Sequence, residues 1–171
     1  MGGEFGQSSE WNHEKSLDWH LLEYDYHRGI QTIVKDLNEI YKTEPALFRY
    51  SFEQRGFQWI DYGDRENSVI AYQRHGDRKE ELLIVIDNFT PEIRQHYRVG
   101  VPFRGQWKEF YNSDDSRYGG SGVRNHGLLM TSPVKLHQQD YSVSLTLPPL
   151  GMVVLKLERE VNEFDLKDIS T

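Results

Sequence analysis

The sequence predicts a mainly β protein: an antiparallel β-sandwich preceded by a loop and one long α-helix. Beyond Ala46, short runs of residues alternate between apolar and polar, which is the period of a strand with one buried face. Turn residues separate these runs at the spacing that is typical of a sandwich. Before Pro45, apolar residues instead recur at intervals of three and four, which indicates an amphipathic helix.

The helix is expected over residues 26–43. Pro45 should end it, because the residue before a proline is pushed out of the α region. We expect its apolar stripe to be covered, since exposing so many apolar side chains is costly and exposed patches tend to dock or associate. The β-domain should cover the end near Ile40, and a second copy should contact the end near Ile30. The stripe consists of Ile30, Ile33, Val34, Leu37 and Ile40.

Seven runs beyond the helix are candidate strands. The run 82–86 is continuously apolar, as expected of a central strand that is buried on both faces. The last two runs flank a Pro-Pro-Leu-Gly break, and we expect them to pair with each other. Trp59 and Trp107 fall in strand-like runs, and we expect both in the core. The candidate strands are 57–62, 68–74, 82–88, 96–99, 107–112, 142–147 and 153–157.

Composition excludes several classes of function. The formal charge of -7 argues against a nucleic-acid surface, which needs a basic face. No run reaches about 18 apolar residues, so no membrane-spanning helix is expected. The first residues show no signal-peptide pattern, and cysteine is absent. We therefore expect a cytoplasmic protein.

No metal or cofactor is expected. His13, His20 and His27 are spaced by seven residues, so no two of them stand at the one-turn spacing that a helical pair of histidine ligands needs. The glycines at 119–122 lack the Lys-Ser/Thr pair of a phosphate-binding loop.

A series of motifs resembles one family. Taken in order, they are similar to the C-terminal part of bacterial 1,4-α-glucan (glycogen) branching enzymes of the α-amylase superfamily. The resemblance covers the chain to about residue 157, and residues 158–171 depart from it. The motifs are MGGEFGQ (1–7), EWNH (10–13), SLDWHLL (16–22), HRG (27–29), YKTEPAL (41–47), NFTP (88–91), YRVGVP (97–102), YGGSG (118–122) and LPPLG (147–151).

This resemblance implies three regions. Residues 1–45 would be the end of a catalytic (β/α)₈ barrel, comprising the loop after its last strand and its final helix. Residues 46–158 would form the all-β C-terminal sandwich domain, and residues 159–171 a charged tail.

The resemblance also implies the activity of the complete enzyme. Such an enzyme cuts an α-1,4-glucan and rejoins the segment to a 6-hydroxyl, which makes the α-1,6 branches of glycogen. This retaining chemistry uses two carboxyl groups about 5–5.5 Å apart and a covalent glycosyl intermediate. In the family these carboxylates lie on earlier barrel strands, before residue 1 of this chain. We therefore expect no catalytic residue here and no activity from the chain alone. Its partners would be the missing barrel and, through the full-length enzyme, α-glucan such as glycogen or amylose.

Four residues before the helix are candidate substrate contacts. Glu4 lies where loops at the C-terminal mouth of a barrel begin, although a structural role is equally compatible. Trp11, in a polar stretch, is a candidate platform for a sugar ring. Trp19, flanked by leucines, favours packing. Asp18 favours capping of a helical turn over binding a sugar hydroxyl.

Two other functions compete with that of an enzyme fragment. A free-standing carbohydrate-binding β-sandwich is compatible with the many aromatic residues, although its start would resemble the end of a barrel. An independent hydrolase has no positive support, because acidic pairs are expected by chance in so charged a chain, and fold alone does not supply function.

Overall fold

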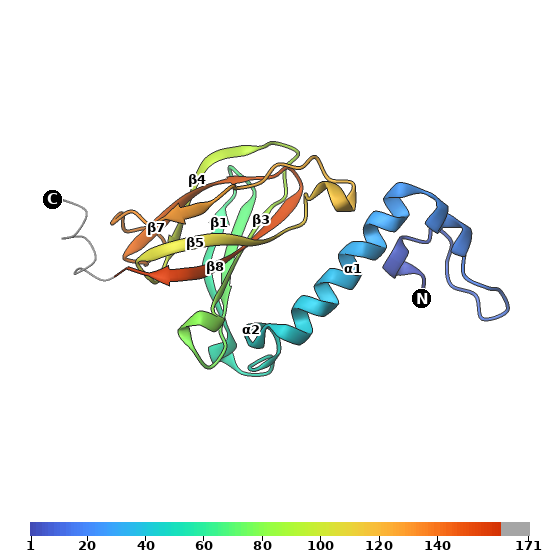
Figure 1. The fold of residues 1–171 in the computed structure, drawn as a ribbon, viewed down its shortest axis with the longest axis horizontal. Helices are drawn as coiled ribbons and strands as arrows, with labels where there is room; N and C mark the ends of the chain where they lie inside the picture. The colour runs from blue at the N-terminus through green and yellow to red at the C-terminus, as the bar shows by residue number, and fades with distance from the viewer. Residues whose placement is uncertain (162–171) are drawn as a thin grey trace.

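The computed structural model describes residues 1–161 and shows two antiparallel sheets packed against each other, with a long helix beside them (Figure 1). The larger sheet has six strands in the order β1-β2-β3-β8-β5-β6, and the smaller has β4 and β7. This confirms the predicted mainly β fold class. The strands are β1 (Phe57–Asp64), β2 (Val69–Arg74), β3 (Leu83–Asn88), β4 (Arg94–Val101), β5 (Gly105–Asn112), β6 (Leu128–Met130), β7 (Tyr141–Leu147) and β8 (Gly151–Glu160), which together form the β-domain.

The main core lies between the two sheets. We call the face of the six-stranded sheet that meets β4 and β7 its inner face, and the opposite face its outer face. Ile84 and Ile86 of β3 belong to the inner core, whereas Leu83 and Val85 belong to a second cluster on the outer face. The prediction of a strand buried on both faces is therefore confirmed, because β3 lies in the middle of the sheet.

The predicted pairing of the last two strands is wrong. β7 pairs with β4 in the small sheet, and β8 lies between β3 and β5 in the large one. The turn through Pro148 and Gly151 therefore carries the chain from one sheet to the other. Alternation along each run is the same in either arrangement, so it does not identify the partner strand.

The long helix α1 (Asp25–Thr43) is followed at once by the short α2 (Pro45–Phe48). Pro45 ends α1 as predicted and occupies the first turn of α2, where its missing N–H costs nothing. Two polar contacts hold this corner against the sheet. Glu44 accepts hydrogen bonds from Lys156 Nζ at 2.6 and 2.8 Å, and the Arg74 guanidinium donates to the carbonyls of Ala46 and Leu47.

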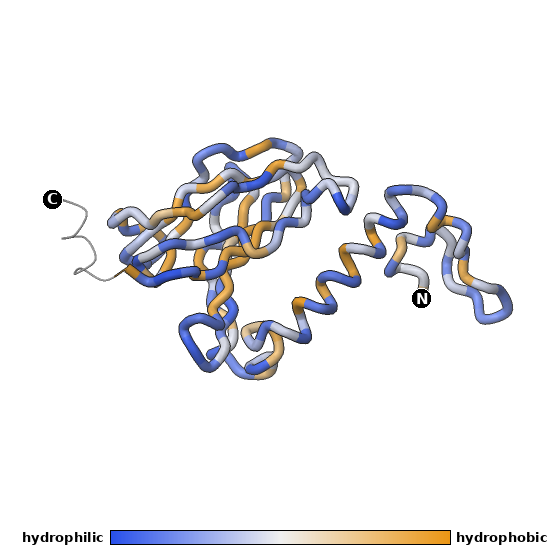
Figure 2. The backbone as a smooth tube through the Cα atoms, viewed as in Figure 1, coloured by the Kyte–Doolittle hydropathy of each residue, from blue (hydrophilic) through white to orange (hydrophobic). Residues whose placement is uncertain are grey.

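The apolar stripe of α1 is covered in part. Ile33 and Ile40 pack against the outer-face cluster of the β-domain, as expected for the C-terminal end. Ile30 and Leu37 remain 38% and 37% exposed. Figure 2 shows apolar positions recurring along α1 and gathering in the strands. The predicted contact with a second copy near Ile30 stays a prediction.

The predicted boundary at residue 158 falls inside β8, which continues to Glu160. Most of the predicted tail, residues 162–171, lies outside the described residues. Among residues 1–161, no helix combines the length and the apolar character needed to cross a bilayer.

Candidate functional site

Residues 1–24, the N-terminal segment, fold against the beginning of α1 (Figure 1). Two short 3₁₀ helices organise the segment, η1 (Gly3–Phe5) and η2 (Trp19–Glu23). Phe5 is fully buried, and its carbonyl oxygen lies 2.8 Å from His27 Nδ1 of α1. A carbonyl oxygen only accepts, so His27 holds its proton on Nδ1 and donates.

Trp19 and Asp18 lie at the start of η2. The Trp19 ring stacks on Phe5 with 5.2 Å between ring centroids, yet 53% of the residue is exposed. The expectation of packing therefore describes only part of its environment. Asp18 occupies the N-cap position, but its side chain makes no capping hydrogen bond, so the capping role is wrong. Its carboxylate instead accepts from Ser9 Oγ at 2.6 Å, across the loop.

Glu4 and Trp11 are both exposed. Glu4 accepts a hydrogen bond from the Gly2 N–H at 2.9 Å, which ties down the first turn of the chain. Trp11 lies on the loop between η1 and η2, and its nearest ring neighbour is His13, with centroids 6.3 Å apart. The structure thus brings Asp18 and Trp19 together, whereas Glu4 and Trp11 make no hydrogen bond or ring contact with each other among the described residues.

The chemistry available in this segment is that of binding. Exposed indole rings stack on the apolar faces of sugars, and the nearby carboxylates accept hydrogen bonds from hydroxyls. Within residues 1–161, no three histidine, aspartate or glutamate side chains gather closely enough to hold a metal ion. The substrate roles of Glu4, Trp11, Asp18 and Trp19 remain predictions.

A second aromatic region lies on the outer face of the sheet, and sequence reasoning missed it. Trp107 is fully buried as predicted, but Trp59 is 46% exposed, so its expected place in the core is wrong. We call Phe57, Trp59, Tyr62 and Tyr72 the aromatic surface. The ring centroid of Trp59 lies 4.9 Å from that of Phe57, 5.7 Å from Tyr62 and 5.9 Å from Tyr72.

The position of β1 explains the exposure of Trp59. β1 is an edge strand, and the helices pack over the cluster that β3, β8 and β5 form, so they leave the edge uncovered. An irregularity in the pairing after Trp59 also shifts the register of β1. The inward-facing Ile60 is buried, whereas Trp59 and Tyr62 contact each other in the exposed cluster. In the sequence, the aromatic residues at positions 57, 59 and 62 are the pattern that could have indicated this aromatic surface.

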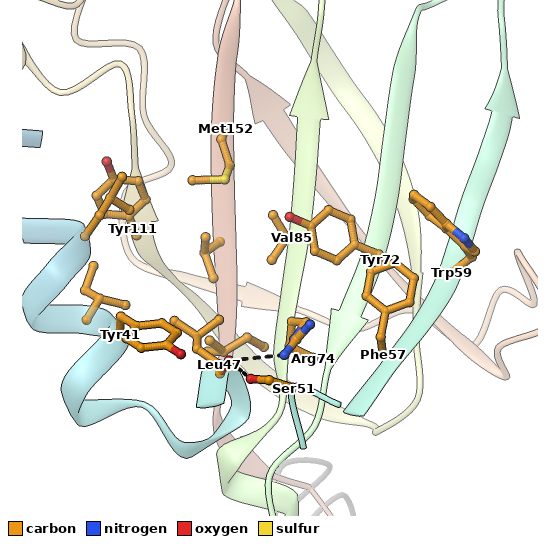
Figure 3. A pocket seen from close by; sticks show the side chains of 14 residues that line it. Tyr41, Leu47, Ser51, Phe57, Trp59, Tyr72, Arg74, Val85, Tyr111 and Met152 are labelled. Carbon is orange, nitrogen blue, oxygen red and sulfur yellow. Dashed lines mark hydrogen bonds between the residues drawn. The ribbon is translucent and has the colours of Figure 1, made fainter. Parts of the chain in front are cut away.

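A groove of about 700 Å³ separates α1 and α2 from the outer face of the sheet. Figure 3 shows Tyr41 and Leu47 on its helical side, Val85 and Met152 on its floor, and Phe57 and Trp59 at its far edge. Its lining is mostly apolar, with Ser51 and Arg74 as polar members. The aromatic surface is therefore the edge of a larger apolar hollow.

Asp87 lies near the end of β3, beside Met152 of β8. It forms no hydrogen bond or ion pair with the described residues, and it lines a smaller hollow with Phe89 and Leu150. Burial raises the pKa of Asp87 from its ordinary value of 3.8 to about 6. The carboxyl group is therefore unusually easy to protonate.

The fold defines a class of protein: an all-β domain of two antiparallel sheets, joined to an amphipathic helix that packs on the larger sheet. Residues 59–158 match the family model described as "Alpha amylase, C-terminal all-beta domain", and the chain belongs to this family.

Its similarity to named proteins extends over nearly the whole chain. It is 52% identical over 158 residues to "1,4-alpha-glucan branching enzyme GlgB" of Aquifex aeolicus (strain VF5), covering 92% of this chain and 25% of that protein. It is 50% identical over 157 residues to the protein of the same name from Cellvibrio japonicus (strain Ueda107), covering 92% of this chain and 21% of that protein. The predicted resemblance to branching enzymes is confirmed, and the chain spans only about a quarter of the length of these relatives.

A solved structure supports the fold alone. It is described as "Crystal structure of AmyP in complex with maltose", and it matches with a TM-score of 0.51 at 15% identity, covering 80% of this chain and 22% of that one.

Proposed function

We propose that this chain is the C-terminal part of a 1,4-α-glucan branching enzyme that acts in cytoplasmic glycogen biosynthesis. The complete enzyme would transfer α-1,4-glucan segments to form α-1,6 branches, and residues before this chain would carry its catalytic carboxylates. The observation that carries the proposal is the sequence identity of 50–52% with relatives named as branching enzymes. This identity covers 92% of the chain, and so includes both the region before the β-domain and the β-domain itself.

The role proposed for this part is to brace a barrel. The partly exposed stripe residues Ile30 and Leu37 and the apolar groove support this role, because they leave apolar surface that a further partner could cover. Complete burial of such a side chain contributes roughly 1.5–3 kcal/mol, so covering the exposed third of each would contribute about 0.5–1 kcal/mol and would favour a fixed arrangement against a barrel.

The N-terminal segment would contribute contacts to the glucan. Trp19 offers one exposed ring face while the other is held against Phe5, and Asp18 lies beside it. A ring fixed in this way loses little conformational freedom when a sugar stacks on it. Glu4 and Trp11 would extend the contact area along the loop.

The proposal predicts that the isolated chain neither branches nor hydrolyses amylose, because it would lack the nucleophile and the acid. Iodine staining and a reducing-end assay measure the two activities. Activity that survives purification, and that is lost when a residue of this chain is replaced, would contradict the proposal.

One observation favours a second candidate function, that of a carbohydrate-binding domain. The exposed Trp59 and Tyr62 present adjoining rings beside a groove, which suits stacking against an oligosaccharide. As a fragment, the chain should bind maltoheptaose only in the millimolar range or more weakly, measured by calorimetry. Micromolar binding that is abolished by Trp59→Ala but retained in Trp11→Ala would favour the second candidate.

A further inference from the structure

We infer that the β-domain positions the N-terminal segment by holding α1 in place through the loop that carries Tyr118. The importance of this attachment for catalysis rests on the proposed function, because the N-terminal segment holds the candidate substrate contacts. This attachment follows from two contacts between α1 and that loop, both on the same side of the helix.

The first contact is polar. Tyr118 lies in the short 3₁₀ helix η5 (Ser116–Tyr118), after β5, and is buried. Its hydroxyl donates to Asp36 Oδ2 of α1 at 2.7 Å. Arg117 Nη1 lies 3.3 Å from the same carboxylate oxygen, and Arg117 Nη2 donates to the Tyr118 hydroxyl at 3.1 Å. Burial and the Asp36 carboxylate raise the pKa of Tyr118, so the hydroxyl keeps the proton that it donates.

The second contact is a close approach of backbones. Gly29 is the one buried residue of α1, and a Cβ at this position would collide with the carbonyl oxygen of Tyr118. Glycine weakens a helix relative to alanine, so its place in the second turn of α1 needs a reason from packing. Gly29 and Asp36 are seven residues apart, two helical turns, and therefore lie on the same side of α1.

The loop is itself fixed to the sheet. The Ser113 N–H donates to the Met152 carbonyl of β8 at 2.9 Å. The buried Asp114 accepts from Ser121 Oγ at 2.6 Å and from the Val123 N–H at 2.9 Å, which closes the loop around Tyr118. Tyr118 is therefore held by the β-domain before it meets α1.

The same turns of α1 hold the N-terminal segment. His27 Nδ1 donates to the Phe5 carbonyl, and the Arg28 guanidinium donates to the carbonyls of Leu22 and Glu23 at 2.9 and 2.7 Å. A Cβ at Gly6 would meet Ile30 Cδ1 at 2.8 Å, so that contact is also close. Residues 27–30 of α1 thus lie between the β-domain on one side and the N-terminal segment on the other (Figure 1). A shift of α1 away from Tyr118 would move Phe5, and with it the stacked Trp19.

Amide hydrogen exchange on the chain tests the coupling without any glucan. Asp36→Ala removes the acceptor for Tyr118, whereas Asp36→Asn keeps an oxygen in place. We expect Asp36→Ala to raise exchange in residues 3–7 and 19–24 by about tenfold or more, with β3 and β8 unchanged. Asp36→Asn should restore most of the protection. Asp140→Ala, which removes an exposed partner of Lys135, is the control and should change neither region.

Unchanged exchange in the N-terminal segment of Asp36→Ala would overturn the coupling. Equal losses in the segment and in β3 would also overturn it, because they would show a general role in stability. Tyr118→Phe provides a second variant that keeps the ring and removes only the donor, and it should reproduce the result of Asp36→Ala.

In the longer protein that carries this chain, Asp36→Ala should raise the KM for amylose several-fold and leave kcat within about twofold, as expected of lost substrate positioning. Restoration of KM by Asp36→Asn would support the inference, and an unchanged KM would overturn its link to substrate. If exchange responds as expected but the longer protein forms no branches, the coupling stands and the proposed function fails.

Discussion

The inner and outer faces of the six-stranded sheet are covered to very different extents. On the inner face, Ile84, Trp107 and Leu155 are completely buried against the small sheet. On the outer face, α1 and α2 cover the middle strands but leave a groove of about 700 Å³ and a half-exposed Trp59. Both faces belong to the same strands, so the difference arises from what packs on them.

Within one sheet, the inner face therefore mainly stabilises the fold, whereas the outer face also retains surface for interaction. The hydrophobic contribution to the free energy of folding grows with the apolar area removed from water, so the completely buried inner face contributes more than the outer one. An apolar face that is only half covered contributes less to the isolated chain and retains surface for a further partner. Substitutions on the two faces should therefore have effects of different size.

The largest loss should follow Trp107→Ala on the inner face. The indole is fully buried, and its Nε1–H donates to the Phe103 carbonyl at 3.2 Å. Removing it should lower the free energy of unfolding by about 3–5 kcal/mol, through the cavity and the unpaired carbonyl. Urea denaturation measures this loss. A loss of less than about 1 kcal/mol would mean that the inner core repacks around the gap.

A smaller loss should follow Lys156→Met, at the corner where α2 meets the outer face. The substitution leaves the buried Glu44 carboxylate without its cation. Loss of one member of a buried pair costs about 3–5 kcal/mol, and the partial exposure of Lys156 reduces this to about 2–3 kcal/mol. Lys108→Met is the matched control, because its partner Glu158 is about half exposed, whereas Glu44 is buried, and it should cost less than about 1 kcal/mol. Equal losses in the two variants would contradict the assigned burial of the Glu44–Lys156 pair.

Asp87→Asn should stabilise the chain. The pKa of Asp87 is raised to about 6 in the folded state, so between about pH 4 and pH 6 the folded protein binds more protons than the unfolded one. Stability from this group is thus present at low pH and is lost as pH rises through that window. Because Asp87 is still partly exposed, we expect the substitution to raise the free energy of unfolding by roughly 1–2 kcal/mol at about pH 7. It should also flatten the decline of the free energy of unfolding with rising pH. A pH series of urea denaturations checks this, with Asp140→Asn as an exposed control. A parallel decline in Asp87→Asn would contradict the assignment.

The smallest effect should come from Trp59→Ala at the edge of the outer face. Almost half of this residue is already exposed, so its removal should cost no more than about 1 kcal/mol. Thermal and urea denaturation together provide the measurement. A loss as large as that of Trp107→Ala would show that the outer face carries as much of the core as the inner one.

Part of this contrast was predictable from the sequence. The continuous apolar run from Leu82 to Ile86 predicts a central strand, because a strand that is buried on both faces has apolar residues at every position. The spacing of apolar residues before Pro45 predicts α1, because a helix that is buried along one stripe has apolar residues every three or four positions. Alternation reports only that one face of a strand is apolar. It does not say which sheet accepts the strand, so the partners of β7 and β8 were predicted wrongly.

The candidate sites show the same limit. The sequence placed Trp59 and Trp107 in equivalent runs, but whether a tryptophan is covered depends on helices that pack from elsewhere in the chain. Asp18 was expected to cap η2 because short carboxylates commonly do so. Its side chain instead reaches Ser9 across a loop, a contact between residues nine positions apart that no local pattern indicates.

The most direct test of the account is a chimera. In the Aquifex aeolicus branching enzyme, the region that is 52% identical to this chain would be replaced by this chain. The fall in absorbance of the amylose–iodine complex reports branching. We predict that the chimera branches amylose, and that the same enzyme without this region, like the isolated chain, does not. A folded chimera with no branching activity would contradict the central claim that this chain is the C-terminal part of a branching enzyme.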